Sequence, residues 1–218
     1  MSTILILDFD STFVQVETLD VLAELSKDGR TAKKIASLTN AAMQGEISFH
    51  EALLARLTCL SLTRQTIVEA TKALQSKITQ SFERQKAYIQ KCASSTYIIS
   101  GGFKEIILPI VKPFNIFPEN VFANTLLYEG DKVCGLDLEN PLAHDHGKVK
   151  LVKSLSLSQP VHLIGDGYTD YELKAQGLVA TFFVLTENVR RQAVIAKADR
   201  VINTFEEYIE ITHENFIS

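Results

Sequence analysis

Short apolar runs recur along the chain, and four of the five are continuous rather than alternating. Continuous Val, Ile, Leu and Phe residues are typical of strands that are covered on both faces, as in a parallel sheet flanked by helices. The predicted strands cover residues 3–8, 96–100, 160–166, 178–185 and 199–204. Apolar residues at helical spacing lie between them, at 81–92, 103–112, 148–155, 170–176 and 187–196. The pattern predicts an α/β fold built on a parallel sheet.

Two intervals break this alternation. About ninety residues separate the first strand from the second, far more than one crossover helix requires. Within 16–77 the apolar positions recur at helical spacing only, which predicts a small helical cap domain (15–77) inserted into a core formed by 1–14 and 78–218. In residues 121–138, two β-rich runs flank Glu129-Gly130-Asp131, which predicts a β-hairpin.

Charge narrows the class of function. The 218 residues include 22 basic and 26 acidic side chains, and the net charge is -4. Lys and Arg are scattered among carboxylates, so we expect no nucleic-acid partner, whereas a small anionic substrate remains possible through local positive groups.

The number and spacing of the cysteines and the lengths of the apolar runs bear on where the protein is located and on its partners. Cys59, Cys92 and Cys134 are odd in number and unevenly spaced, which is typical of a reducing cytoplasm rather than of a disulfide framework. The chain begins without a signal-peptide pattern, and no apolar run approaches the roughly 18 residues of a membrane span. We therefore expect a cytoplasmic protein with no membrane partner, either a monomer or a homodimer.

Two carboxylates follow the first predicted strand, in Asp8-Phe9-Asp10-Ser11-Thr12. Ligand sites of open α/β sheets lie at the carboxyl ends of the strands. Such a pair can divide a reaction, with one carboxylate attacking as a nucleophile and its neighbour giving and then taking a proton. The alternative is a loop with acidic helix caps.

A second acidic cluster, Asp166-Gly167-Tyr168-Thr169-Asp170, follows another continuous apolar run and reaches the same edge of the sheet. Four carboxylates in one crevice repel each other unless a cation joins them, and oxygen ligands suit Mg²⁺ better than Zn²⁺. Alternatively, Asp170 is only a helix cap.

Two further candidates are a Ser-Gly-Gly turn between a predicted strand and a helix, and a lysine at the start of another predicted helix. In Ser100-Gly101-Gly102 a hydroxyl and exposed amides can hold phosphate oxygens. Lys148 can supply a fixed cation, although Lys150 and Lys153 compete with it and a helix-opening lysine is usually a surface group.

Together these segments resemble the haloacid dehalogenase superfamily: DxDxT at 8–12, a serine at 100, a lysine at 148 and GDGxxD at 165–170. The resemblance implies a Rossmann-like core and Asp8 as phosphoryl acceptor. It implies Mg²⁺ held by Asp8, by Asp10 through its backbone carbonyl and by Asp166, with Asp170 in support. Ser100 and Lys148 would bind the phosphoryl group. An aspartate at position 10 favours an enzyme that hydrolyses its acyl phosphate. A dehalogenase has no use for this second carboxylate, and an enzyme that stores the acyl phosphate usually has a threonine there.

The cap segment is similar to that of the phosphoserine phosphatases. In that family the residues matching Glu17, Met43, Phe49 and Arg56 line the pocket. Glu17 would then contact the substrate ammonium and Arg56 its carboxylate, while Met43 and Phe49 would exclude water. Without the resemblance, Met43 and Phe49 are cap core, and Arg56 is a solvated arginine beside Glu51 or Glu46.

The sequence therefore predicts a Mg²⁺-dependent phosphomonoester hydrolase that works through an aspartyl phosphate on a small substrate, with O-phosphoserine preferred. Three alternatives stay open: transfer of the phosphoryl group to another small alcohol such as homoserine, a phosphatase of another metabolite, and a non-catalytic binder of phosphate ligands. His144 and His146 flank Asp145 in a metal-like triplet, for which a surface loop is the preferred interpretation.

Overall fold

A computed structural model describes residues 3–26, 29–44 and 47–214. Its centre is a six-stranded parallel sheet with the strand order β3-β2-β1-β6-β7-β8. The strands are β1 (Ile4–Leu7), β2 (Thr96–Phe103), β3 (Val121–Asn124), β6 (Val161–Gly165), β7 (Thr181–Leu185) and β8 (Arg200–Ile202). The predicted α/β fold with a parallel core is confirmed.

The continuous apolar runs bury both faces of the sheet, as the pattern predicted. In β1 the alternate residues Leu5 and Leu7 pack into one hydrophobic core, whereas Ile4 and Ile6 pack into a second core on the opposite face. The side chains of a strand point alternately to its two faces, so one short run contributes to both cores. This double burial fixes β1, and with it the residues that follow, at the centre of the molecule.

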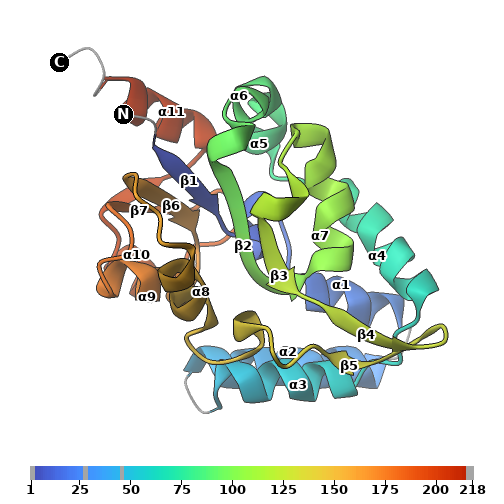
Figure 1. The fold of residues 1–218 in the computed structure, drawn as a ribbon. Helices are drawn as coiled ribbons and strands as arrows, with labels where there is room; N and C mark the ends of the chain where they lie inside the picture. The colour runs from blue at the N-terminus through green and yellow to red at the C-terminus, as the bar shows by residue number, and fades with distance from the viewer. Residues whose placement is uncertain (1–2, 27–28, 45–46, 215–218) are drawn as a thin grey trace.

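Helices cover the two faces (Figure 1). On one face lie α5 (Gln80–Arg84), α6 (Lys86–Lys91), α7 (Lys104–Val111) and α11 (Phe205–Glu214). On the other lie α8 (Gly147–Leu155), α9 (Tyr168–Ala175) and α10 (Gln192–Ile195). The helix predicted over 81–92 is split into α5 and α6. The helix predicted over 187–196 forms only from Gln192, because the preceding side chains form hydrogen bonds to other loops instead.

The part of the long interval predicted as the cap, residues 15–77, contains four described α-helices: α1 (Thr18–Leu25), α2 (Gly29–Gln44), α3 (Phe49–Thr58) and α4 (Arg64–Gln75). Helix α4 packs on both α1 and α7, and α2 packs between α1 and α3. Figure 1 shows α2 and α3 side by side beyond the carboxyl ends of the central strands. Helices α3 and α4 begin with capping boxes at Ser48 and Thr63, which define their start points.

The predicted hairpin is present but shorter than the region assigned to it. Strands β4 (Leu126–Glu129) and β5 (Lys132–Leu136) pair in antiparallel fashion. The run before them, Val121–Asn124, joins the main sheet as β3 because its residues pair with β2. The hairpin contacts the segment before α4, where the Val133 amide donates to Leu62 at 2.9 Å and Arg64 lies over the Tyr128 ring at 3.9 Å.

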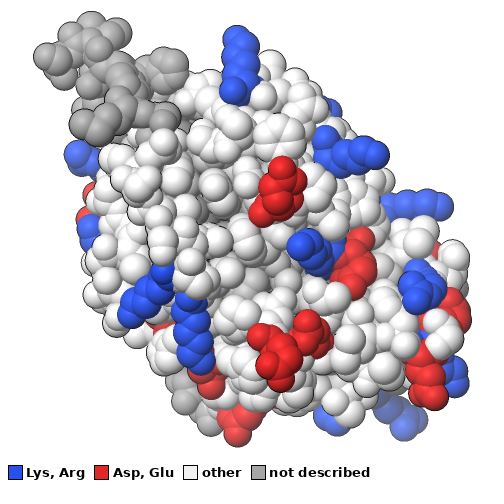
Figure 2. Space-filling model, viewed as in Figure 1, with Lys and Arg blue, Asp and Glu red and all other residues white. Residues whose placement is uncertain are grey.

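Charged residues are dispersed on the face drawn in Figure 2, where Lys and Arg stand among Asp and Glu with uncharged areas between them. Among the described residues, no helix is long and apolar enough to cross a membrane. All three cysteines, Cys59, Cys92 and Cys134, are free thiols.

Candidate active site

A cavity of about 730 Å³ lies at the carboxyl ends of the central strands, between the sheet and α3. Its wall combines the strand ends and the cap helices. Almost all the candidates from the sequence line it, namely Asp8, Asp10, Glu17, Phe49, Arg56, Ser100, Gly101, Gly102, Lys148 and Asp166. Asp170 lies behind Lys148 rather than on the wall itself. Of the candidates, only Met43 has a side chain outside the described part of the structure.

Asp8 follows β1 directly and is buried. Its Oδ1 accepts hydrogen bonds from the Phe9 amide at 2.7 Å and from Lys148 Nζ at 2.8 Å. No described residue donates to Oδ2, so this oxygen is available to a ligand. Burial and the neighbouring Asp170 hold the pKa of Asp8 well above its ordinary value, against the opposing effect of Lys148.

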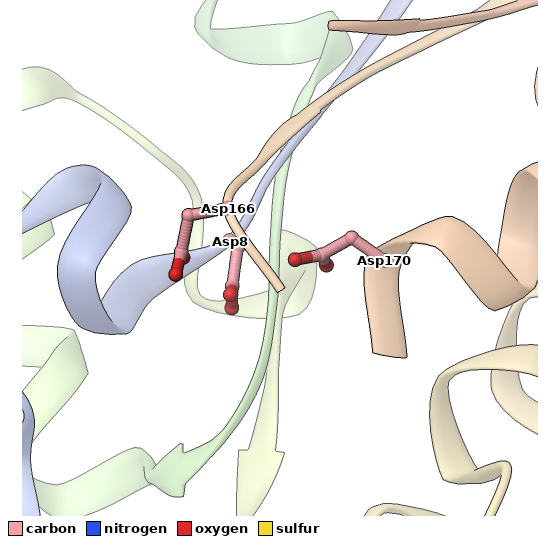
Figure 3. Close-up of side chains that lie close together, drawn as sticks. All are labelled: Asp8, Asp166 and Asp170. Atoms are coloured by element: carbon pink, nitrogen blue, oxygen red, sulfur yellow. The ribbon is translucent and has the colours of Figure 1, made fainter. Parts of the chain in front are cut away.

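Three carboxylates gather at this point. Asp8, Asp166 and Asp170 each offer an oxygen, and these oxygens lie within 4.8 Å of one another. Figure 3 shows Asp8 and Asp166 side by side after their strands, with Asp170 reaching toward them from the start of α9. Burial and the nearby Asp170 raise the pKa of Asp166 to about 6. An all-oxygen donor set of three carboxylates fits a hard divalent cation such as Mg²⁺.

Lys148 is the buried cation of the site. Its Nζ donates to Asp8 Oδ1 at 2.8 Å and to Asp170 Oδ1 at 2.7 Å. Burial opposes its charge, but Asp170 and Asp8 outweigh burial and raise its pKa, so Lys148 is charged at neutral pH. Asp170 reaches this position because Gly165 has no side chain: a Cβ there would lie 2.4 Å from Asp170 Oδ2. Lys148 therefore bridges two of the three carboxylates.

Asp10 is placed differently from Asp8. Its Oδ1 accepts hydrogen bonds from the amide, at 3.0 Å, and from the hydroxyl of Thr18, the first residue of α1. Its Oδ2 points toward Gly102, where a Cβ would lie 3.4 Å away. Burial and the nearby Glu17 raise the pKa of Asp10 to about 7, so both protonation states are accessible near neutral pH. The carboxylate of Asp10 lies outside the three-carboxylate cluster.

The end of β2 forms another part of the wall. Ser100 is buried, and its Oγ accepts from the Gly102 amide at 2.9 Å. Gly101 is required by a close approach, because a Cβ there would lie 2.7 Å from the Phe49 ring. Phe49 at the start of α3 thus lies directly over the β2 turn and covers this side of the cavity.

Glu17 and Arg56 stand on the cap side of the same cavity. Glu17 Oε1 accepts from Ser11 Oγ at 2.6 Å and from Arg191 at 3.2 Å. Arg56 donates from Nε to the Ala52 carbonyl at 3.0 Å and from Nη1 to Thr39 Oγ1 at 3.3 Å. Burial lowers the pKa of Arg56, whereas Glu17 and Asp10 oppose that shift. The interpretation of Arg56 as a solvated surface residue is wrong, because its exposed fraction is 8%.

Several site residues were absent from the sequence prediction. Thr12 donates to Asp166 Oδ1 at 2.9 Å, and Arg191 donates from Nε to Asp166 Oδ2 at 2.8 Å. Thr12 belongs to the DxDxT pattern and was therefore visible in the sequence. Arg191 lies in a stretch that the apolar spacing assigned to a helix, and no local pattern marked it.

The histidine triplet lies on the loop before α8, where His146 is exposed, and this loop also lines the cavity. His144, Asp145 and His146 all line the cavity. Asp145 Oδ1 accepts from the His50 amide at 3.1 Å, and the His50 and His144 rings stack at 4.8 Å. His146 pairs with Glu172 at 2.8 Å instead of facing a metal with His144. This loop therefore connects the core to α3.

Buried carboxylates and a bridging lysine at the ends of parallel strands are suited to binding a phosphate ligand. The comparisons with known proteins agree: the model of the haloacid dehalogenase-like hydrolases matches residues 5–174. The chain belongs to this family.

Similarity extends to proteins of known name. The chain is 33% identical over 206 residues to the chloroplastic phosphoserine phosphatase of Arabidopsis thaliana, which covers 93% of this chain and 69% of the relative. It is 31% identical to the human phosphoserine phosphatase, covering 93% of this chain and 89% of the relative.

A solved structure shows the same fold over nearly the full length. The phosphoserine phosphohydrolase-like protein of Francisella tularensis superposes with a TM-score of 0.85 at 32% identity, covering 96% of this chain and 99% of that one. The chain is therefore an enzyme of the phosphoserine phosphatase-like type.

Proposed function

We propose that this enzyme hydrolyses O-phosphoserine to serine and phosphate through an aspartyl phosphate on Asp8, with Mg²⁺ as its cofactor. The single observation that carries the proposal is the shared cavity. One space contains a carboxylate with an available oxygen, a second carboxylate with a pKa near 7, and a Glu17/Arg56 pair of opposite charge.

In the first step Asp8 Oδ2 attacks phosphorus, the P–O bond to the substrate breaks, and Asp10 gives its proton to the departing serine oxygen. The raised pKa of Asp10, about 7, keeps that proton available at neutral pH. The hydrogen bonds on Asp8 Oδ1 orient the carboxylate and leave Oδ2 toward the ligand.

In the second step Asp10, now ionised, takes a proton from water as the water oxygen attacks phosphorus. The bond from phosphorus to Asp8 breaks, which regenerates the free carboxylate and releases phosphate. A carboxylate at the position of Asp10 thus serves both half-reactions, and this role favours turnover over storage of the acyl phosphate.

Mg²⁺ would be held by Asp8, Asp166 and the backbone carbonyl of Asp10, with Asp170 in support. When bound, it supplies charge stabilisation for the transferring phosphoryl group. Lys148 contributes a second fixed positive charge beside Asp8, while the Ser100 hydroxyl and the Gly101 amide offer donors to the phosphoryl oxygens, and Gly102 orients Ser100 through its amide.

Substrate selection would fall to the cap side. Phosphoserine carries one ammonium and one carboxylate at a fixed separation, and Glu17 and Arg56 are the matching charges on that wall. Phe49 over Gly101 excludes water, and Met43 is proposed to do the same. The names of the relatives support the choice of phosphoserine.

The cap division at residues 15–77 also remains part of the proposal, and the contacts between its two linkers support it. Val14 and Ile78 form an antiparallel bridge, and the Gln15 amide donates to the Lys77 carbonyl at 2.8 Å. The two linkers therefore run side by side, which suits a hinge for cap opening. We also propose a cytoplasmic location, on the unpaired cysteines.

The test is phosphate release with Mg²⁺ from O-phosphoserine, O-phosphothreonine and a sugar phosphate, measured for the wild type and Arg56→Ala. We expect strong preference for phosphoserine and loss of that preference in the variant, through a KM increase of roughly 10- to 100-fold. A broad profile insensitive to Arg56 would reject phosphoserine as the substrate. Serine production without equivalent free phosphate when homoserine is added would indicate phosphotransfer instead.

A further inference from the structure

The segment between β7 and α10 contacts the nucleophile loop, Phe9–Phe13, through the side chain of Asn188. This segment was predicted as helix, but its residues before Gln192 lie outside any described helix. Two consecutive side chains, Glu187 and Asn188, point instead to loops that are distant in sequence. Neither residue takes part in the proposed chemistry.

Asn188 holds the backbone of the nucleophile loop. Its Nδ2 lies 3.1 Å from the Ser11 carbonyl, 3.3 Å from the Thr12 carbonyl and 2.7 Å from Thr79 Oγ1. Thr79 in turn donates from Oγ1 to the Thr12 carbonyl at 2.6 Å. One amide group therefore fixes two successive peptide groups of the loop that follows Asp10.

The same contacts reach the linker that returns from the cap. Thr79 at the end of this linker and Ser81 in the first turn of α5 are fully buried. The Thr79 amide donates to the Phe13 carbonyl at 3.0 Å, and the Ser81 amide donates to Glu187 Oε1 at 3.1 Å. Glu187 and Asn188 thus bind the return linker at two points, beside the antiparallel bridge of Val14 and Ile78.

The held loop is the one on which the chemistry depends. Ser11 has a left-handed backbone with a φ of 54°, which is uncommon for a residue other than glycine and persists only where surrounding contacts enforce it. Thr12, whose carbonyl Asn188 approaches, also donates to Asp166. A shift of this loop would therefore move Asp10 and Asp166 relative to Asp8.

We propose that Asn188 is a positioning residue that holds the nucleophile loop in its reactive conformation and joins that loop to the cap's return linker. The kinetic part of this inference rests on the proposed function, whereas the structural part does not. The joined linker gives cap movement a direct mechanical path to the catalytic loop, because Thr79 contacts both Asn188 and Thr12.

Asn188→Ala, Asn188→Asp and Thr79→Val test the proposal, with Asn203→Ala as the matched control. Asn203 bonds to Thr186 and Glu207 near the same strand end, and it makes no described contact with the nucleophile loop. For Asn188→Ala we expect kcat to fall about 10- to 100-fold with KM within about threefold, since small misplacements of reacting groups cost this much. Asn188→Asp should lose more, because its carboxylate faces two carbonyl oxygens.

Hydrogen exchange supplies a measurement that does not depend on activity. In Asn188→Ala and in Thr79→Val we expect the amides of 9–14 and 77–82 to exchange faster together, while Asn203→Ala leaves them unchanged. Exchange that is unaltered in both segments, or kcat equal to the wild type, would overturn the proposal. If the wild type lacks phosphatase activity, the proposed function fails while coupled exchange still supports the positioning role.

Discussion

The two walls of the cavity differ in how firmly they are held. On the core wall, Asp8, Asp166 and Asp170 are buried and cross-linked by Lys148, Thr12 and Arg191. On the cap wall, Arg56 is held mainly by the carbonyl of its own helix at Ala52, and Phe49 lies in a contact with Gly101. Several elements therefore cross-link the core wall, whereas Arg56 and Phe49 of the cap wall stand on a single helix, α3.

This difference suggests a division of roles between the walls. Charged groups that must be aligned within tenths of an ångström lie where packing and ion pairs fix them from several elements. In the proposed function, the groups that recognise the substrate lie on the cap, which opens and closes over it. Changes on the core wall should therefore affect every substrate, and changes on the cap wall should affect substrates selectively.

Asp8→Asn should have the largest effect. Removal of the nucleophile should lower phosphate release at least about 10³-fold for every phosphomonoester, whatever its leaving group, because no second attacking group lies in the same position. The assay is release of phosphate from phosphoserine and from an aryl phosphate. Asp199→Asn, which alters a carboxylate paired with Lys174, is the control. Wild-type turnover by Asp8→Asn would reject the assignment of the nucleophile.

Asp166→Asn should come next, through the cofactor. We expect the affinity for Mg²⁺, measured by calorimetric titration, to fall by about 100-fold or more, since the variant loses a charged oxygen ligand. Without Mg²⁺ the variant should melt at a higher temperature than the wild type, because burial of the Asp166 charge and its repulsion with Asp170 together outweigh its ion pair with Arg191. Unchanged Mg²⁺ affinity would place the cation elsewhere.

A smaller effect, on substrate binding rather than on turnover, is expected at Asp145 in the cavity wall. Asp145→Ala removes the acceptor for the His50 amide and weakens the contact of α3 with the core. We predict a KM increase of roughly three- to tenfold for phosphoserine with little change in kcat. Asp137→Ala, which removes a comparable bond to the Glu139 amide within the core, is the control. Equal kinetics in the two variants would show that this contact does not hold the cap.

The smallest predicted effect is on the free energy of unfolding, and it concerns His162 in β6, which does not line the cavity. The His162 ring lies tilted against Phe183 and edge-on to Tyr208, and burial lowers its pKa. Below about pH 6.5 the unfolded chain gains a proton at His162 that the folded protein resists, so this residue lowers the free energy of unfolding as pH falls.

Comparison with His162→Gln isolates that contribution, because the carboxylates of the site are common to both proteins. Chemical denaturation between pH 7 and pH 5 should show a steeper loss of stability in the wild type, by at most about 1.4 kcal/mol per pH unit. Parallel profiles would mean that His162 titrates alike in the folded and unfolded states.

The core wall was predictable from the sequence because its residues follow continuous apolar runs. Asp8 and Asp166 come directly after strands that are buried on both faces, and parallel strands end at one edge. Their convergence is thus a consequence of the sheet. The order of the motifs in the resembling family then identified Lys148, which local spacing alone did not distinguish from Lys150 and Lys153.

The remainder depended on tertiary contacts that no local pattern encodes. The composition of the run 121–124 suits either a hairpin strand or a strand of the main sheet. Only its pairing with β2 assigns it to the main sheet. Apolar spacing favours a helix over 187–196, but the side chains of Glu187, Asn188 and Arg191 bond to loops from other parts of the chain. These long-range bonds override the local preference of that segment.

The most direct test is chemical trapping of the phosphorylated enzyme. The wild type is mixed with Mg²⁺ and phosphate-labelled O-phosphoserine, quenched in acid within one turnover, and digested for mass spectrometry. We predict label on the peptide that contains Asp8, released by hydroxylamine as expected for an acyl phosphate, and no label in Asp8→Asn. Full release of phosphate with no labelled peptide, or label on a residue other than Asp8, would contradict the central claim.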